Sequence, residues 1–305
     1  MAMMAMTRTE TRSSTCVYGP DSRICIIAGG GNLPAAIAEY LDRQGIGVFV
    51  LMVEGETDPQ SRLERYDHET LALEEAPSLI RRLRHHGITH VVMAGEIRRR
   101  PRISAMRPGL GLLRHVPALI RALSSGDDGL LRFVVAWLEG SGFRVVGAHQ
   151  IVPDLVAAEG QFGRIQPQKT DWRDIQAARI AAEAIGALDI GQGAVAIGGR
   201  AIALEGIEGT DAMLERVRSL RGHGRLAGKL RGVLVKCSKP GQEARTDLPS
   251  IGPRTVEEAH AAGLAGIAVE AGSSLVLNGP EMIHKADALG LFIIGLPPKE
   301  TRHEG

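Results

Sequence analysis

The stretch 23–34 reads Arg23-Ile-Cys-Ile-Ile-Ala-Gly-Gly-Gly-Asn-Leu-Pro34, and a helical pattern follows it up to Arg43. The residues before the glycines are apolar and largely β-branched, which is typical of a buried strand. The glycines predict a tight turn, and Asn32 and Pro34 suit the start of a helix. This order of strand, glycine turn and helix predicts the first unit of a parallel sheet.

The rest of the first half alternates in the same way. The predicted strands are Arg23–Ala28, Ile46–Val53, His90–Ala94 and Arg144–Val146, and the predicted helices are Leu33–Arg43, Ser78–His86 and Leu130–Glu139. Strands that alternate with helices predict a parallel, doubly wound sheet. We therefore expect an α/β fold with a Rossmann-like amino-terminal domain.

The pattern changes after about Val152. Gly198-Gly199 separates two short apolar runs and predicts a hairpin turn. A helix over Asp171–Ile185, capped by Thr170 or Asp171, is expected to open the second half. The other predicted elements are the strands Ala194–Ile197, Arg200–Leu204, Gly232–Lys236, Gly266–Val269, Ser274–Leu277 and Leu291–Gly295, and the helices Ala212–Leu220, Thr255–Ala262 and Pro280–Leu289. This half is expected to be a mixed α/β domain.

The chain has 305 residues, which as a prior corresponds to about two domains. We expect a loose leader at 1–20, the Rossmann-like domain at 21–153, a linker at 154–167 and the second domain at 168–305. With 44% hydrophobic and 23% charged residues, the composition is that of an ordinary globular protein. Its apolar runs are too short for a membrane-spanning helix.

The charge balance excludes several classes of partner. Lys and Arg number 36 against 35 Asp and Glu, so the net charge of +1 gives no reason to expect nucleic acid. The three cysteines have neither an even count nor the spacing of a metal site. They favour a reducing compartment, and we expect a cytoplasmic protein.

The turn Gly29-Gly-Gly-Asn32 is the first candidate site. A glycine-rich turn before a helix can present backbone N–H groups to a phosphate, and Glu54 follows the second strand where a dinucleotide enzyme places its ribose ligand. However, Pro34 stands where the third glycine of the dinucleotide pattern is required. The turn is thus either a phosphate contact or a purely structural feature of the fold.

Two charged stretches of the first half are also open to two interpretations. The run Arg98-Arg-Arg-Pro-Arg102, with Arg107 and Arg114, suits phosphate or an anionic membrane surface, but such runs are usually solvated. The run Gly126-Asp-Asp-Gly129 can bind a cation or a hydroxyl group. It also suits the N-terminus of the next helix, and capping is the expected role.

Acids and lysines follow two predicted strands of the second half. Glu205, Thr210 and Asp211 come after one strand, and Lys236 and Lys239 come after another. Asp247 lies in a loop rich in glycine and proline, with no helix next to it that it would cap. Carboxylates of this kind suit Mg²⁺ or Mn²⁺ and lysines suit phosphate, so the set favours phosphoryl chemistry.

Other catalytic motifs are disfavoured. His86 and His90 are four residues apart, but Gly87 breaks the helix that a paired zinc site needs. Cys237 has no histidine nearby in the sequence and is expected to be structural. No G-x-S-x-G pattern occurs in the chain, so serine hydrolase chemistry is not indicated.

As an ordered set, several motifs resemble the LpxI family of UDP-2,3-diacylglucosamine diphosphatases, over about Ile26 to Gly295. They are Ala28-Gly-Gly-Gly-Asn-Leu-Pro34, Ala94-Gly-Glu96, Gly126-Asp-Asp-Gly129, Gln168-Lys-Thr-Asp171, Glu205-Gly-Ile-Glu-Gly-Thr-Asp211, Lys236-x-x-Lys-Pro-Gly-Gln242, Asp247-Leu-Pro-x-Ile-Gly252 and Glu270-Ala-Gly272. The sequence is most similar to alphaproteobacterial members.

The resemblance implies two domains with the ligand between them. It also implies hydrolysis of UDP-2,3-diacylglucosamine to UMP and 2,3-diacylglucosamine 1-phosphate (lipid X), by attack of water on the β-phosphorus with Mg²⁺ or Mn²⁺. Such a substrate lies in a membrane, so peripheral contact with the inner face of the inner membrane is expected, as is a homodimer. Arg98–Arg102 is the expected basic contribution to that surface.

Asp247 is the residue that the resemblance marks as essential, either as metal ligand or as base. We expect Asp247, Lys236 and Asp211 to be catalytic, and Asp247, Asp211 and Glu205 to hold the metal. The expected substrate-binding residues are Gly29, Gly30, Gly31, Asn32, Asp128, Lys169, Thr170, Thr210 and Lys239. Two rival functions stay open, namely an NAD(P)-dependent oxidoreductase, which Pro34 disfavours, and a nucleotide sensor without catalytic activity.

Overall fold

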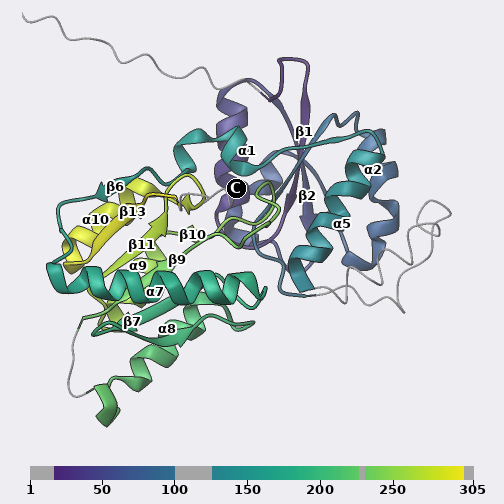
Figure 1. Ribbon diagram of the computed structural model, residues 1–305. Helices are drawn as coiled ribbons and strands as arrows, with labels where there is room; N and C mark the ends of the chain where they lie inside the picture. Colours follow the sequence, from purple (N-terminus) through teal and green to yellow (C-terminus); the bar gives the residue numbers. More distant parts are fainter. Residues whose placement is uncertain (1–16, 100–125, 227–230, 299–305) are drawn as a thin grey trace, which may run out of the picture.

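The first half of the chain folds around the predicted strand and turn. The computed structural model describes residues 17–99, 126–226 and 231–298. Its first sheet has the order β3-β2-β1-β4-β5 with all pairs parallel (Figure 1). The strands are β1 Arg23–Ala28, β2 Gly47–Val53, β3 Asp67–Leu71, β4 His90–Ala94 and β5 Arg144–Val145. The predicted parallel, doubly wound sheet is confirmed, and its strand order is that of a Rossmann fold.

Helices cover both faces of this sheet. Ile24 and Ile26 point to one face, where they join a buried cluster with residues of α1 Leu33–Arg43 and α6 Ala148–Ile151. Cys25 points to the opposite face, with buried residues of α2 Leu79–His85 and α5 Gly126–Gly140. This alternation is what a strand buried on both faces requires, because successive side chains point to opposite sides of a sheet.

Several boundaries in this half differ from the prediction. The edge strand β3 was not predicted, because its sequence Asp-His-Glu-Thr-Leu is polar and only Leu71 is buried. Helix α5 begins at Gly126 instead of Leu130, so Asp128 lies in its first turn. Asn32 precedes α1 as expected, but its side chain makes no capping hydrogen bond.

The second half forms a mixed sheet of order β6-β13-β11-β9-β7-β8. Its strands are β6 Gly160–Phe162, β7 Gly193–Ile197, β8 Arg200–Leu204, β9 Val233–Lys236, β11 Gly266–Glu270 and β13 Phe292–Leu296. Strands β9, β11 and β13 are parallel, whereas β6, β7 and β8 join antiparallel. The predicted hairpin is confirmed, and both turn glycines have positive φ, +62° at Gly198 and +78° at Gly199.

Helix α7, Lys169–Ala187, covers one face of this sheet, and α8 to α10 cover the other (Figure 1). Their bounds are α8 Gly209–Leu220, α9 Pro253–Ala261 and α10 Gly279–Leu289. Short 3-10 helices are Pro59–Ser61, Leu63–Arg65, Leu73–Ser78, Pro153–Leu155 and Gly224–Leu226. No helix of the described residues is long and apolar enough to cross a membrane.

Three features of the second half differ from the sequence-based expectation. The segment 154–167, expected as a linker, contains β6, which pairs with β13. The N-cap of α7 is Gln168, not Thr170 or Asp171, although the Asp171 carboxylate accepts a hydrogen bond from the Gln168 N–H at 2.8 Å. The strand expected at Ser274–Leu277 is β12 Leu275–Val276, which pairs with β10 Ser250–Ile251 outside the main sheet.

The two halves are in direct contact through β12. Leu275 belongs to the buried cluster of the first sheet, and Leu248 and Leu277 pack against that cluster. The loop between β9 and β10, residues 237–249, therefore runs next to the first domain. This contact positions the loop that carries Asp247.

Candidate functional site

A hydrogen-bonded chain of three side chains lies at the carboxyl end of β9. The Lys236 side chain is buried, and its Nζ donates to the Thr210 Oγ1 at 2.8 Å and to the Ser250 carbonyl oxygen at 3.2 Å. The Thr210 hydroxyl donates in turn to Glu205 Oε1 at 2.6 Å. The prediction that polar residues at these strand ends gather together is thus correct for Glu205, Thr210 and Lys236.

Two glycines make room for Glu205. A Cβ at Gly193 would lie 2.7 Å from Glu205 Oε2, and one at Gly191 would lie 2.2 Å from the Glu205 carbonyl oxygen. The Gln192 N–H donates to Glu205 Oε2 at 3.2 Å. Both carboxylate oxygens of Glu205 are therefore hydrogen-bonded within the protein.

Asp247 lies within the loop 237–249 and is bound by another residue of that loop. The Gln242 amide donates to Asp247 Oδ2 at 2.5 Å. Burial raises the pKa of Asp247, and the hydrogen bond from Gln242 and the positive charges of Lys239 and Lys236 oppose that rise. The negative charge of Asp128 raises the pKa further. A carboxyl group in these surroundings is suited to accept a proton, and the two ammonium groups are suited to phosphate.

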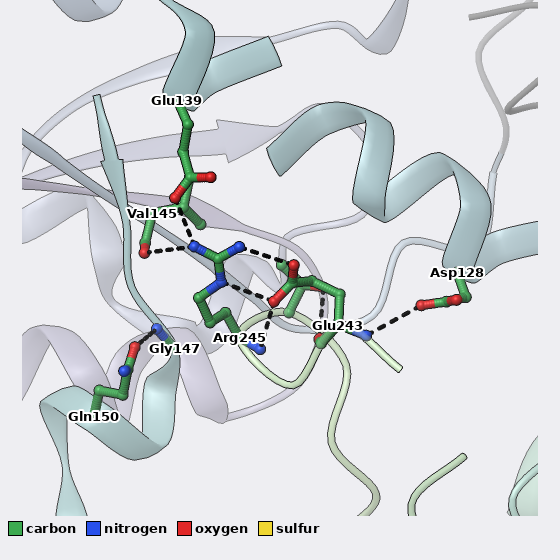
Figure 2. Close-up of polar contacts among 8 residues, drawn as sticks. Asp128, Glu139, Val145, Gly147, Gln150, Glu243 and Arg245 are labelled. Atoms are coloured by element: carbon green, nitrogen blue, oxygen red, sulfur yellow. Dashed lines mark hydrogen bonds and ion pairs between the residues drawn. The ribbon is translucent and has the colours of Figure 1, made fainter. Parts of the chain in front are cut away.

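Asp128 brings the first domain to this loop (Figure 2). Its carboxylate is buried, forms an ion pair with Arg132 and accepts a hydrogen bond from the Glu243 N–H at 3.2 Å. Neither of these contacts is a helix cap, so the expected capping role of this acid stays a prediction. Asp128 and Asp247 are 119 positions apart in the sequence, and the negative charge of Asp128 acts on Asp247 across the contact between the domains.

The three predicted metal ligands are not gathered into one centre. Asp211 forms an ion pair with Arg254 at 2.9 Å and is half exposed, while Glu205 is bound to Thr210 and Gln192. In the described part of the chain, no group of three or more His, Cys, Asp or Glu side chains is arranged to hold a metal ion. Asp211, Glu205 and Asp247 therefore do not form the predicted metal-ligand set.

The glycine turn is closed by backbone hydrogen bonds. The Gly29 N–H donates to the Ala94 carbonyl oxygen at 2.8 Å, and the Gly30 N–H donates to that of Glu96 at 2.8 Å. A Cβ at Gly29 would lie 2.5 Å from the Glu96 carbonyl oxygen. Two of the N–H groups expected to bind phosphate are therefore already used, and close backbone packing explains the first glycine.

The remaining predicted binding residues lie in different places. Lys169 and Thr170 are exposed in the first turn of α7. Lys239 is largely buried, and its Nζ forms an ion pair with Asp189 at 2.8 Å. Gly31 has a φ of +82°, which favours glycine.

The first arginines of the basic run after β4 form ion pairs and hydrogen bonds with acidic side chains. Arg98 pairs with Glu96 and Arg99 pairs with Glu74, and the Glu56 carboxylate accepts hydrogen bonds from the backbone N–H groups of both arginines. Arg102, Arg107 and Arg114 lie outside the described residues. Arg98 and Arg99 thus have acidic partners, and the contact of this run with phosphate or a membrane surface stays a prediction.

Sequence reasoning missed the residues that hold the Asp247 loop. Ser238 donates from its N–H and its hydroxyl to Glu270 at 3.1 and 2.6 Å, and Gln242 accepts from the Lys239 N–H at 2.9 Å. Gln242 and Glu270 belong to two of the motifs that resemble the LpxI family, and these motifs were the signal in the sequence that could have indicated them. The first-domain partners of Glu243 and Arg245, Asp128 and Glu139, lie more than 100 positions away in the sequence. No local pattern indicates these contacts.

The chain matches two family models that together span most of its length. The LpxI N-terminal domain matches residues 23–155, and the LpxI C-terminal domain matches residues 158–294. A curated relative, UDP-2,3-diacylglucosamine pyrophosphatase LpxI of Caulobacter vibrioides, is 41% identical over 280 residues, which cover 91% of this chain and 99% of that protein.

Two solved structures of UDP-glucose 4-epimerases are distantly similar to this chain. A UDP-glucose 4-epimerase of Thermus thermophilus in complex with NAD is 13% identical with a TM-score of 0.30, covering 91% of this chain and 87% of that one. The UDP-glucose 4-epimerase of Thermotoga maritima with UDP-glucose is 9% identical with a TM-score of 0.31, covering 92% and 87%. Similarity at this level does not indicate a shared activity.

Proposed function

The chain belongs to the LpxI family, and from that membership we infer that it is a UDP-2,3-diacylglucosamine pyrophosphatase of lipid A biosynthesis. The identity of 41% over nearly the whole curated relative carries this conclusion. The predicted enzyme class agrees with it. The products UMP and lipid X follow from cleavage of the pyrophosphate bond of this substrate.

For the chemical step, we propose that Asp247 is the base. Its carboxylate takes a proton from a water molecule whose oxygen attacks the β-phosphorus. The bond from the β-phosphorus to the bridging oxygen breaks, and UMP leaves with that oxygen. The raised pKa of Asp247 supports this role, because a carboxylate with a raised pKa binds a proton more readily.

Lys236 and Lys239 are proposed to stabilise the charge that develops on the phosphates. Lys236 is buried and held by Thr210 and the Ser250 carbonyl oxygen, so its ammonium group has a fixed place. A fixed positive charge stabilises a transition state without reorganisation during the reaction. Glu205 positions Thr210, which in turn positions Lys236.

The function is tested by UMP release from UDP-2,3-diacylglucosamine in detergent. In water labelled with ¹⁸O, attack on the β-phosphorus puts the label into lipid X, whereas attack on the α-phosphorus puts it into UMP. Tight NADH binding without UMP release would favour the oxidoreductase. UDP binding with no turnover would favour the nucleotide sensor.

Dependence on Mg²⁺ or Mn²⁺ is a separate proposal, which rests on the family resemblance and on the charge of the substrate. EDTA is expected to stop UMP release, and added Mg²⁺ is expected to restore it. A full rate in EDTA would reject the metal requirement while leaving the pyrophosphatase assignment intact.

A substrate with two acyl chains partitions into a membrane, so we also propose peripheral contact of this protein with the cytoplasmic leaflet, and assembly as a homodimer. In a flotation gradient, the protein is expected to rise with vesicles that contain anionic lipid, and protein that stays at the bottom would reject membrane contact. Light scattering is expected to give twice the mass of one chain, and the mass of a single chain would reject the homodimer.

A further inference from the structure

Arg245 occupies the middle of the loop 237–249 and binds two carboxylates at once (Figure 2). Its Nε donates to Glu243 Oε1 at 2.7 Å and its Nη2 donates to Glu243 Oε2 at 2.9 Å, so Glu243 is bound by both sides of the guanidinium fork. Its Nη1 donates to Glu139 Oε1 of α5 at 2.6 Å. One side chain thus connects the loop of the second domain with a helix of the first.

Two further contacts fasten the same loop to the first domain. The Arg245 Nη1 lies 3.5 Å from the carbonyl oxygen of Val145, at the end of β5, and the Glu243 N–H donates to Asp128. In Figure 2 these contacts converge on the loop from α5 and from the end of β5. The loop is therefore held from the first domain at the helix that carries Asp128.

Asp247 depends on this arrangement through the backbone. The Asp247 N–H donates to the Glu243 carbonyl oxygen at 3.2 Å, and the Thr246 N–H donates to the same oxygen at 3.0 Å. Glu243 thus starts the turn that ends at Asp247. Its side chain is held by Arg245 and its carbonyl group fixes the Asp247 backbone.

We propose that Arg245 is a positioning residue for Asp247, because it joins Glu243 to Glu139 and so fixes the turn that ends at Asp247. The role rests on the proposed function, since Asp247 is the proposed base. Arginine suits this role best, because its planar fork binds one carboxylate through two N–H groups while a third N–H reaches another. A lysine at this position has a single ammonium group and loses the fork.

The test compares Arg245→Gln with Arg231→Gln. Arg231 is a matched control because its Nε and Nη2 also donate to the two oxygens of one carboxylate, that of Asp171, at 3.0 and 2.6 Å. Both variants are assayed for kcat and KM of UMP release, and their melting temperatures are recorded. Misplacement of a catalytic group by about 1 Å costs up to about 100-fold in rate.

For Arg245→Gln, we expect kcat to fall about 10- to 100-fold with KM little changed, and Arg245→Lys to recover part of the loss. Arg231→Gln is expected to keep the wild-type kcat. Glu139→Gln combined with Arg245→Gln should lower kcat by less than the product of the single effects, because both changes remove the same ion pair between Glu139 and Arg245.

A second readout is independent of turnover. Hydrogen exchange of the backbone N–H groups at 243–247 is expected to rise in Arg245→Gln and to stay unchanged in Arg231→Gln. Wild-type kcat in a folded Arg245→Gln, or an equal fall in both variants, would overturn the positioning role. No UMP release from the wild type would overturn the proposed function and the positioning role with it.

Discussion

The glycine turn after β1 and the loop after β9 occupy equivalent places, because each follows a central strand at the carboxyl end of its sheet. The turn is held by its own backbone, through the hydrogen bonds of Gly29 and Gly30 to Ala94 and Glu96. The loop is held by side chains, among them Glu270 of its own domain and Glu139 of the other. The first is fixed by backbone hydrogen bonds to the end of β4 and the second by hydrogen bonds and ion pairs of side chains.

This difference indicates a structural role for Gly29 and Gly30 of the turn and a catalytic role for the loop. The N–H groups of Gly29 and Gly30 already bind carbonyl oxygens and are not available to a phosphate, so these two glycines hold β1 against β4. The loop instead brings Lys239 and Asp247 close to Lys236 and to Asp128. Charged side chains that converge from both domains can act on a substrate, which favours the loop as the centre of the site.

Asp247→Asn gives the largest expected effect, because it removes the charge from the loop and keeps the shape of the side chain. We expect kcat for UMP release to fall by about 10²- to 10³-fold, the usual cost of losing one group that acts in the transition state. Asp211→Asn is the control, since Asp211 pairs with Arg254. An equal loss in Asp211→Asn would show that both acids act together, as the sequence predicted.

Gly29→Ala tests the backbone-held turn and is the next largest effect. Its new Cβ would lie 2.5 Å from the Glu96 carbonyl oxygen, so β1 and β4 would have to separate. Urea denaturation should show a loss of about 1–3 kcal/mol in the free energy of unfolding. At Gly31, where nothing lies within 4 Å and only the positive φ opposes a side chain, alanine should cost about 1 kcal/mol. Equal costs at the two positions would contradict close packing at Gly29.

Acid should weaken a contact held by side chains more than one held by backbone. The Glu69 carboxylate of β3 is hydrogen-bonded by His86 at 2.7 Å and by Arg82 at 2.8 Å, and these contacts lower the pKa of Glu69. A carboxyl group with a lowered pKa stabilises the fold above its unfolded pKa of about 4.3, and this contribution is lost as the pH falls through the folded value.

Glu69→Gln should therefore cost about 0.5–1 kcal/mol at neutral pH and should flatten the loss of stability below about pH 4.3. Urea denaturation at neutral and acidic pH measures both quantities. An unchanged pH dependence in the variant would show that Glu69 does not contribute.

Asn32→Ala is expected to have the smallest effect. A capping asparagine is usually worth about 1 kcal/mol, but the side chain of Asn32 makes no capping hydrogen bond. The free energy of unfolding should change by less than about 0.5 kcal/mol. A rise in KM for UDP-2,3-diacylglucosamine at unchanged stability would show that Asn32 binds the substrate, as the sequence predicted.

Much of the fold could be predicted because its central strands are buried on both faces. Runs such as Arg23–Ala28 and His90–Ala94 carry that burial in their composition. The strands β3, β6 and β10 were missed because they are short or polar and are paired only at an edge or outside the main sheets. Their pairing depends on the partner strand, which no local pattern describes.

The candidate site was only partly predictable, for the same reason. Lys236 ends one strand, and Glu205 and Thr210 follow another strand of the same sheet, so the sequence could indicate that they gather at strand ends. Asp211 was expected with them. It lies in the first turn of α8 and is paired with Arg254 of α9, and the packing of these two helices decides that outcome.

By itself, the sequence determined the α/β class, the glycine turn, the hairpin and the family to which the chain belongs, because each depends on local patterns or on motifs in a fixed order. Only the tertiary structure decided that Asp128 and Glu139 of the first domain meet the loop of Asp247. An ion pair depends on the distance between two side chains in space and not on their separation in the sequence. Glu139 and Arg245 are 106 positions apart, so no periodic pattern of the chain indicates their contact.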